Sequence, residues 1–147
     1  MKCRLSVFVV LAAALLMPVA GWAKAVEVQL PEEYPVRGGS IQVDSQKFDF
    51  VVLGDRRGGG DEEWPVFDRA IEEINLLNPD FVVMVGDLIQ GYTSDEAEFT
   101  AQWEDFWKHA DALKMPLVMV PGNHDVTNEH MLKHWKETYG RTYYSFD

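Results

Sequence analysis

The chain has 147 residues, with 13 Lys and Arg against 24 Asp and Glu, one Cys and 47% hydrophobic residues. This composition is typical of a globular protein and excludes collagen-like, coiled-coil and low-complexity chains. The formal net charge of −11 argues against nucleic acid as a partner, because binding a phosphate backbone requires a basic surface.

The N-terminus has the pattern of a secretory signal peptide, which we place at residues 1–25. Two basic residues precede an apolar run over 5–17, and small residues allow cleavage after Ala23 or after Ala25. The run is shorter than the roughly 20 apolar residues of a membrane-spanning helix. We therefore expect a mature chain without a membrane span, without Cys3 and in a secreted or periplasmic location.

The rest of the chain divides into a leader segment, 26–46, and one domain, 47–147. The leader mixes prolines, glycines and charges with short alternating runs and could add an edge strand. In the domain, nearly continuous apolar runs over 48–53, 81–85 and 117–120 predict three buried strands.

Amphipathic helices are predicted after each of these strands. The first has Pro65 near its start, an acidic first turn, and an end at Asn78 and Pro79. The second, which Ser94 with Asp95 and Glu96 can cap, carries an aromatic stripe. The third places Met131, Leu132, Trp135 and Tyr139 on one face. A fourth strand is expected over 142–146.

Strands that alternate with helices predict an α/β fold, a parallel β-α-β-α-β layered sheet. The carboxyl ends of all its strands then share one edge, which is where such sheets bind ligands. Polar residues follow each of the three strands at this edge: Asp55, Asp87, and the run Asn123, His124 and Asp125.

The residue types at this edge suit metal chemistry. Carboxylate and amide oxygens of Asp55, Asp87 and Asn123 are ligands that hard divalent cations prefer. A glycine precedes each aspartate and lets the backbone turn sharply as it leaves the strand. A histidine beside a carboxylate, as in His124 and Asp125, can serve as a general acid.

These blocks resemble those of the calcineurin-like metallophosphoesterases, which run Asp-x-His, Gly-Asp-x-x-Asp and Gly-Asn-His-Asp/Glu. The resemblance covers residues 48–146 and implies the N-terminal half of a metallophosphoesterase-type α/β sandwich. It implies that Asp55 ligates a first metal, that Asp87 bridges two metals and that Asn123 ligates the second.

The same resemblance implies the chemistry. It implies a hydrolase that cleaves phosphomonoesters or phosphodiesters of small molecules, with two divalent ions of Mn, Fe or Zn. Two such metals, about 3.5–4 Å apart, clamp a phosphoryl group and activate a bridging water. The catalytic residues would be His124, which contacts the phosphate or protonates the leaving oxygen, and Asp125, which orients it.

The chain departs from the family pattern at three places. Arg57 stands where the first block has His, and guanidinium cannot ligate a metal, so this site is weakened or rebuilt. Arg56 or Arg57 would instead contact the substrate phosphate. Gln90 replaces an Asp that is frequent in the second block. The later blocks Val-x-x-His and Gly-His-x-His do not occur before Asp147, so we expect a truncated domain.

Two other interpretations stay open. His130 and His134, one helical turn apart, could share a metal, although their polar neighbours favour a surface position. The glycines at 58–60 could serve a phosphate- or nucleotide-binding module, but the acids at 61–63 would repel a pyrophosphate. An inactive fragment without catalysis is the remaining alternative, and metal dependence separates it from an enzyme.

Overall fold

The computed structural model describes residues 25–28, 30, 36–44, 46–56 and 64–145. The expected signal peptide up to residue 24, Arg57 and the glycines at 58–60 lie outside the described residues. No helix within the described ranges is long and apolar enough to cross a membrane.

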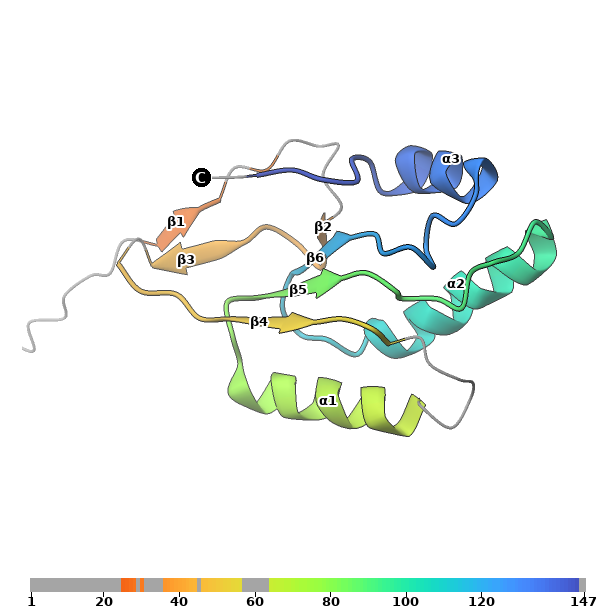
Figure 1. The fold of residues 1–147 in the computed structure, drawn as a ribbon. Helices are drawn as coiled ribbons and strands as arrows, with labels where there is room; N and C mark the ends of the chain where they lie inside the picture. The colour runs from red at the N-terminus through yellow and green to blue at the C-terminus, as the bar shows by residue number, and fades with distance from the viewer. Residues whose placement is uncertain (1–24, 29, 31–35, 45, 57–63, 146–147) are drawn as a thin grey trace, which may run out of the picture.

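A four-stranded sheet with the strand order β2-β6-β5-β4 forms the centre of the fold (Figure 1). Its strands are β2 (Val36–Arg37), β4 (Phe50–Leu53), β5 (Phe81–Val85) and β6 (Leu117–Val120). The last three are parallel, whereas β2 pairs antiparallel with β6. The predicted α/β fold is confirmed, and the leader adds the edge strand β2. Strand β1 (Ala25–Glu27), which begins at the last residue of the expected signal peptide, and β3 (Gln42–Asp44) of the leader form a separate antiparallel pair.

Three helices follow the parallel strands: α1 (Trp64–Leu77), α2 (Glu96–Ala110) and α3 (Glu129–Thr138). Helix α1 ends at Asn78, which has a φ of 51°. As described it begins at Trp64 with no acidic residue in its first turn, and the acids at 61–63 on which that prediction rests lie outside the described residues. Helix α2 begins at Glu96, and of the candidate capping residues Asp95 is the N-cap, since its side chain accepts a hydrogen bond from the Glu98 amide at 2.9 Å.

The helices share one face of the sheet with the main hydrophobic core. Side chains on this face come from alternate strand residues, as in Val82 and Met84 of β5 and Leu117 and Met119 of β6. From the helices, the largest contributions come from aromatic residues: Phe67, Phe99, Trp103, Phe106 and Trp135. The opposite face is covered in part by the leader, through Ile41, and by Tyr144.

The first parallel strand is less buried than its sequence predicts. On the face away from the helices, Phe48 is 51% exposed, Phe50 49% and Val52 55%. The strand order leaves β4 at the edge of the sheet, and the leader covers the region around Phe81 and Val118 instead. An apolar run therefore identifies this strand correctly but not the burial of both its faces.

The fourth strand expected over 142–146 is wrong for the described residues, since 142–145 form no strand. The free side of β6, where such a strand would pair, is occupied at Leu117 and Val118 by β2. Beyond that point, the Tyr144 hydroxyl donates a hydrogen bond to the Met119 carbonyl at 2.6 Å. A side-chain contact thus takes an acceptor that a strand partner would need.

The packing of α3 depends on Trp135, which is fully buried and lies against Trp103 and Tyr139 with ring centroids 6.0 and 5.0 Å away. We expect Trp135→Ala to lower the free energy of unfolding by about 3–5 kcal/mol, because it leaves a large cavity. Leu76→Ala, at a side chain that is 83% exposed, should change it by less than about 0.5 kcal/mol. Urea denaturation of both variants checks this, and equal effects would contradict the described core.

Candidate functional site

The three predicted polar segments come together at one edge of the sheet. Because β4, β5 and β6 are adjacent and parallel, their carboxyl ends lie side by side (Figure 1). Asp87 follows the middle strand of the three and lies between Asp55 and Asn123. Asp55 and Asp87 have φ values of 52° and 55°, in the left-handed region that non-glycine residues rarely adopt. Two strained aspartates at neighbouring strand ends are typical of a functional site.

The loops at this edge are in direct contact. The Asp55 amide donates to the Gly86 carbonyl at 3.1 Å, and the His124 amide donates to Asp87 Oδ1 at 3.1 Å. Only glycine fits at three points of this contact, because a Cβ on Gly86 would clash with the Gly122 nitrogen, a Cβ on Gly122 with Asp87 Oδ1, and a Cβ on Gly91 with the His124 carbonyl oxygen. The glycines therefore allow the loop after β5 and the loop after β6 to approach each other closely.

The carboxylate of Asp125 joins these two loops from within the protein. Its side chain is fully buried. Oδ2 accepts hydrogen bonds from the amides of Asp87 and Gly122, both at 2.8 Å, and Oδ1 accepts from Leu88 and Ile89 at 2.8 and 3.2 Å. Burial raises the pKa of this carboxyl above its usual value, and the four amides oppose that rise.

This arrangement corrects the role expected for Asp125. Its carboxylate binds backbone amides, and the imidazole of His124 has a different partner: Nδ1 lies 2.7 Å from the Gln90 carbonyl oxygen. A carbonyl only accepts, so Nδ1 carries the hydrogen and Nε2 is the nitrogen that can take up or release a proton. Gln90 therefore orients His124 through its backbone, which its side-chain identity did not reveal.

The three expected metal ligands differ in their surroundings. Asp55 is exposed, and its carboxylate has no hydrogen-bond or ion-pair partner among the described residues. Asp87 is half-buried, with Oδ1 on the His124 amide. Asn123 is exposed and donates from Nδ2 to the Tyr92 hydroxyl at 3.0 Å. These oxygen donors fit a hard divalent cation.

The number of these donors is small. Within the described ranges, no group of three or more His, Cys, Asp or Glu side chains could hold a metal ion. Two carboxylates and one amide are fewer ligands than two metals need. The described residues at this sheet edge therefore provide some of the oxygen ligands that a divalent metal site needs, but not a full set for two ions.

Arg56 has structural contacts that the sequence did not predict. Its Nε donates to the Leu88 carbonyl at 2.9 Å, and its guanidinium lies 3.6 Å from the centre of the Trp64 ring. Trp64 in turn stacks on His109 at 4.0 Å, and His109 Nδ1 is 2.6 Å from Asp68. Arg56 thereby connects the loop after β4 to the loop after β5 and to the start of α1. Arg57, the other expected phosphate contact, lies outside the described residues.

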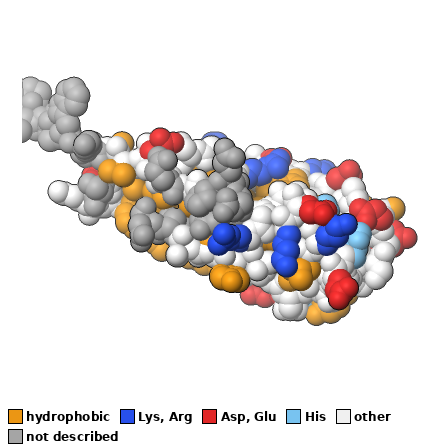
Figure 2. Space-filling view, turned by 90° about the horizontal axis from the view of Figure 1, so that it is seen from above, with side chains coloured by type: hydrophobic (Ala, Val, Ile, Leu, Met, Phe, Trp, Pro, Cys, Tyr) orange, Lys and Arg blue, Asp and Glu red, His pale blue; other side chains and the backbone are white. Residues whose placement is uncertain are grey.

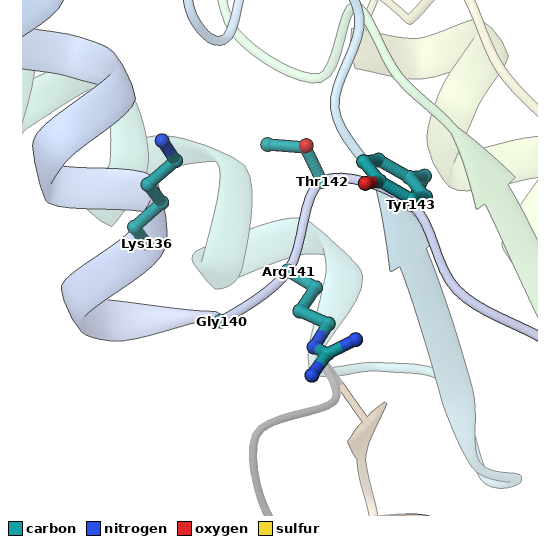
Figure 3. Close-up of a pocket in the computed structure, with 5 residues that line it drawn as sticks. All are labelled: Lys136, Gly140, Arg141, Thr142 and Tyr143. Carbon is teal, nitrogen blue, oxygen red and sulfur yellow. The ribbon is translucent and has the colours of Figure 1, made fainter.

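The surface of the described residues is hollowed beside the sheet edge and near α3. A hollow of about 300 Å³ lies beside Asp55 and is lined by Leu53, Gly54, Asp55, Arg56, Val66, Phe67 and Ala70. Another, of about 520 Å³, lies near the end of α3. Figure 3 shows that its basic side chains, Lys136 and Arg141, point in different directions. On the face in Figure 2, basic and acidic side chains are interspersed.

His130 and His134 do not share a ligand position. His130 Nε2 lies 2.8 Å from a Glu96 oxygen, whereas His134 Nε2 lies 3.4 Å from the Thr138 hydroxyl. Both rings pack edge-on against Phe99 of α2. They help to join α3 to α2, so His134 is partly buried and does not lie on an open polar face as its sequence neighbours predicted.

His134 should make the stability of the protein depend on pH. Burial lowers its pKa, and nearby His130 lowers it further, against the attraction of Glu96 and Glu137. Its contribution to stability is therefore present above the usual pKa of about 6.5 and is lost as pH falls through the lower folded-state value. We expect His134→Gln to lose less stability than the wild type between about pH 7.5 and pH 5 in denaturant titrations. An equal loss in both proteins would contradict this.

The Asp125 contacts predict a specific loss of stability. In Asp125→Asn, the amide group would face two backbone donors, so two buried N–H groups would lose their acceptor. We expect the free energy of unfolding to fall by about 2–5 kcal/mol. Asp55→Asn is the matched control and should change it by less than about 0.5 kcal/mol. Denaturant midpoints of the two variants test this, and a stable Asp125→Asn protein would refute the structural role.

Comparison with known proteins agrees with this site. The sequence model of the calcineurin-like phosphoesterases matches residues 44–146. The chain is 37% identical over 123 residues to the serine/threonine-protein phosphatase CPPED1 of Mus musculus, covering 77% of this chain and 38% of that protein. It is 37% identical to the Homo sapiens CPPED1 over 103 residues, covering 63% of this chain and 32% of that protein.

A bacterial relative is more distant. The chain is 31% identical over 90 residues to a probable cyclic nucleotide phosphodiesterase of Moraxella catarrhalis, covering 58% of this chain and 30% of that protein. The chain spans about a third of the length of these relatives. No solved structure matches it.

The matched region contains the three parallel strands, the three helices and the loops that carry Asp55, Asp87 and Asn123. It is also the family that the sequence blocks resemble, so that prediction is confirmed. The chain belongs to the calcineurin-like phosphoesterase family.

Proposed function

We propose that the protein is a secreted or periplasmic metal-dependent phosphoesterase that hydrolyses phosphomonoesters or phosphodiesters of small molecules. The observation that supports this best is the position of Asp87, on the middle of three adjacent strand ends, between the oxygen donors of Asp55 and Asn123. The names of the relatives, a protein phosphatase and a probable phosphodiesterase, agree with this reaction class.

Each side chain at the edge has a distinct task in this proposal. Asp55, Asp87 and Asn123 would hold divalent ions of Mn, Fe or Zn, with Asp87 central enough to serve two of them. When bound, such ions polarise a phosphoryl group and lower the pKa of a coordinated water. The chain spans about a third of the relatives' length, so the complete site and the activity of the whole protein are part of the proposal.

His124 would supply the proton for the leaving oxygen. Its Nδ1 is held by the Gln90 carbonyl at 2.7 Å, which leaves Nε2 for the substrate. The imidazole is 6% exposed, so its orientation is fixed by packing as well as by this hydrogen bond. A positioned acid of this kind contributes about 100- to 10,000-fold to a rate.

The hollow beside Asp55 would take the organic part of the ester. Apart from Asp55 and Arg56, its lining is largely apolar, with Val66, Phe67 and Ala70 contributed by α1. An apolar wall next to a metal-binding carboxylate suits an ester whose leaving group is uncharged.

Two substitutions separate metal binding from proton transfer. Asp87→Asn should lose both Mn²⁺ binding and hydrolysis of p-nitrophenyl phosphate and bis-p-nitrophenyl phosphate, because it removes the central carboxylate. His124→Ala should bind Mn²⁺ as the wild type does and lower kcat by about 100- to 10,000-fold.

Asp105→Asn is the control, since Asp105 lies on α2 with an exposed ion pair to Lys108, and it should change neither quantity. Calorimetric metal titration and steady-state kinetics measure these effects. Normal turnover in either site variant would refute the proposal, and metal binding without any turnover in the wild type would favour an inactive domain.

A further inference from the structure

Tyr92 is in an unfavourable state for a tyrosine in two respects. It lies in the loop between β5 and α2 with a φ of 54°, in the left-handed region, where a bulky side chain is a clear outlier. Its side chain is also 60% exposed, so burial of the ring does not compensate for the strain. Strain of this kind persists where neighbouring groups hold the residue in place, and it is concentrated at functional sites.

The neighbours of Tyr92 are two residues of the candidate site. Its hydroxyl oxygen accepts a hydrogen bond from Asn123 Nδ2 at 3.0 Å. Its ring packs edge-on against the His124 imidazole, with ring centroids 4.6 Å apart and planes at 85°. Tyr92 therefore contacts both the proposed second metal ligand and the proposed acid.

The contact with Asn123 decides which end of its amide can meet a cation. A carboxamide has one end that accepts and one that donates, and only the oxygen end can ligate a metal. With Nδ2 engaged by Tyr92, Oδ1 is the end that remains for a cation. The backbone of Asn123 is held as well, because the Thr127 hydroxyl donates to its carbonyl at 2.9 Å.

We propose that Tyr92 is a positioning residue that fixes the Asn123 amide with its oxygen presented to a divalent metal ion. This inference rests on the proposed function, because it requires Asn123 to act as a ligand. Tyr92 acts through Asn123 and not on the substrate. Partners that orient a metal ligand typically change metal affinity by about 10- to 100-fold.

Tyr92→Phe tests this directly, since it removes the hydroxyl and keeps the ring against His124. The expected result is a 10- to 100-fold weaker Kd for Mn²⁺, with KM at saturating metal within about twofold of the wild type. Tyr143→Phe is the matched control, because Tyr143 is 81% exposed and lies outside the site, and its Kd should be unchanged. Unfolding midpoints without metal exclude a loss of the fold.

A second variant separates positioning from a general structural effect. Asn123→Asp has oxygen at both ends of its side chain and needs no orientation, so adding Tyr92→Phe to it should leave the Kd for Mn²⁺ unchanged. An equal loss of affinity in both backgrounds would overturn the inference. So would a raised KM with unchanged metal affinity, which would make Tyr92 a substrate contact.

The failure of this inference can be distinguished from that of the proposed function. If the wild type binds Mn²⁺, Asp87→Asn does not, and Tyr92→Phe binds as tightly as the wild type, the positioning role alone is overturned. If Asp87→Asn binds Mn²⁺ as the wild type does, the metal site itself is wrong, and the inference is overturned with it.

Discussion

The geometry of the candidate site depends on the buried carboxylate of Asp125, which binds backbone amides and is not itself a proposed metal ligand. The loops after β5 and β6 lie beyond the hydrogen-bond ladder of the sheet, so their buried backbone amides need other acceptors. Asp125 supplies four such hydrogen bonds and thereby fixes Asp87 relative to Asn123 and His124. Because the carboxylate is fully buried, water does not compete for these amides. The geometry of the polar edge is therefore set from inside the protein.

Much of the fold and of the site could be predicted from the sequence, because both follow from short-range patterns. Apolar runs and helical spacing locate the parallel strands and helices, and parallel connection then brings Asp55, Asp87 and Asn123 to one edge. The contacts around them could not be predicted. The orientation of His124 by Gln90 and the contact of Asn123 with Tyr92 depend on loop backbones that meet across more than 30 residues of sequence.

The errors at the edges of the sheet have a common physical cause. An apolar run indicates a strand, but burial of its second face depends on which other segment reaches it. The leader reaches Phe81 and Val118 and leaves the outer face of β4 open. It also occupies the side of β6 that a strand after α3 would need. Competition between distant segments for the same edge is not encoded in either segment alone.

The left-handed conformations of Asp55 and Asp87 bear on how this protein could evolve or be engineered. Glycine adopts such φ values without strain, so replacing either aspartate by glycine would relieve local strain in the folded chain. At Asp87 the hydrogen bond that Oδ1 accepts from the His124 amide opposes this gain, whereas the Asp55 carboxylate has no such bond among the described residues. Selection for thermal tolerance alone would therefore tend to remove the carboxylate of Asp55, on which metal binding is proposed to depend. Stability and activity compete at this position, and a stabilised variant would have to obtain its gain elsewhere, away from the sheet edge.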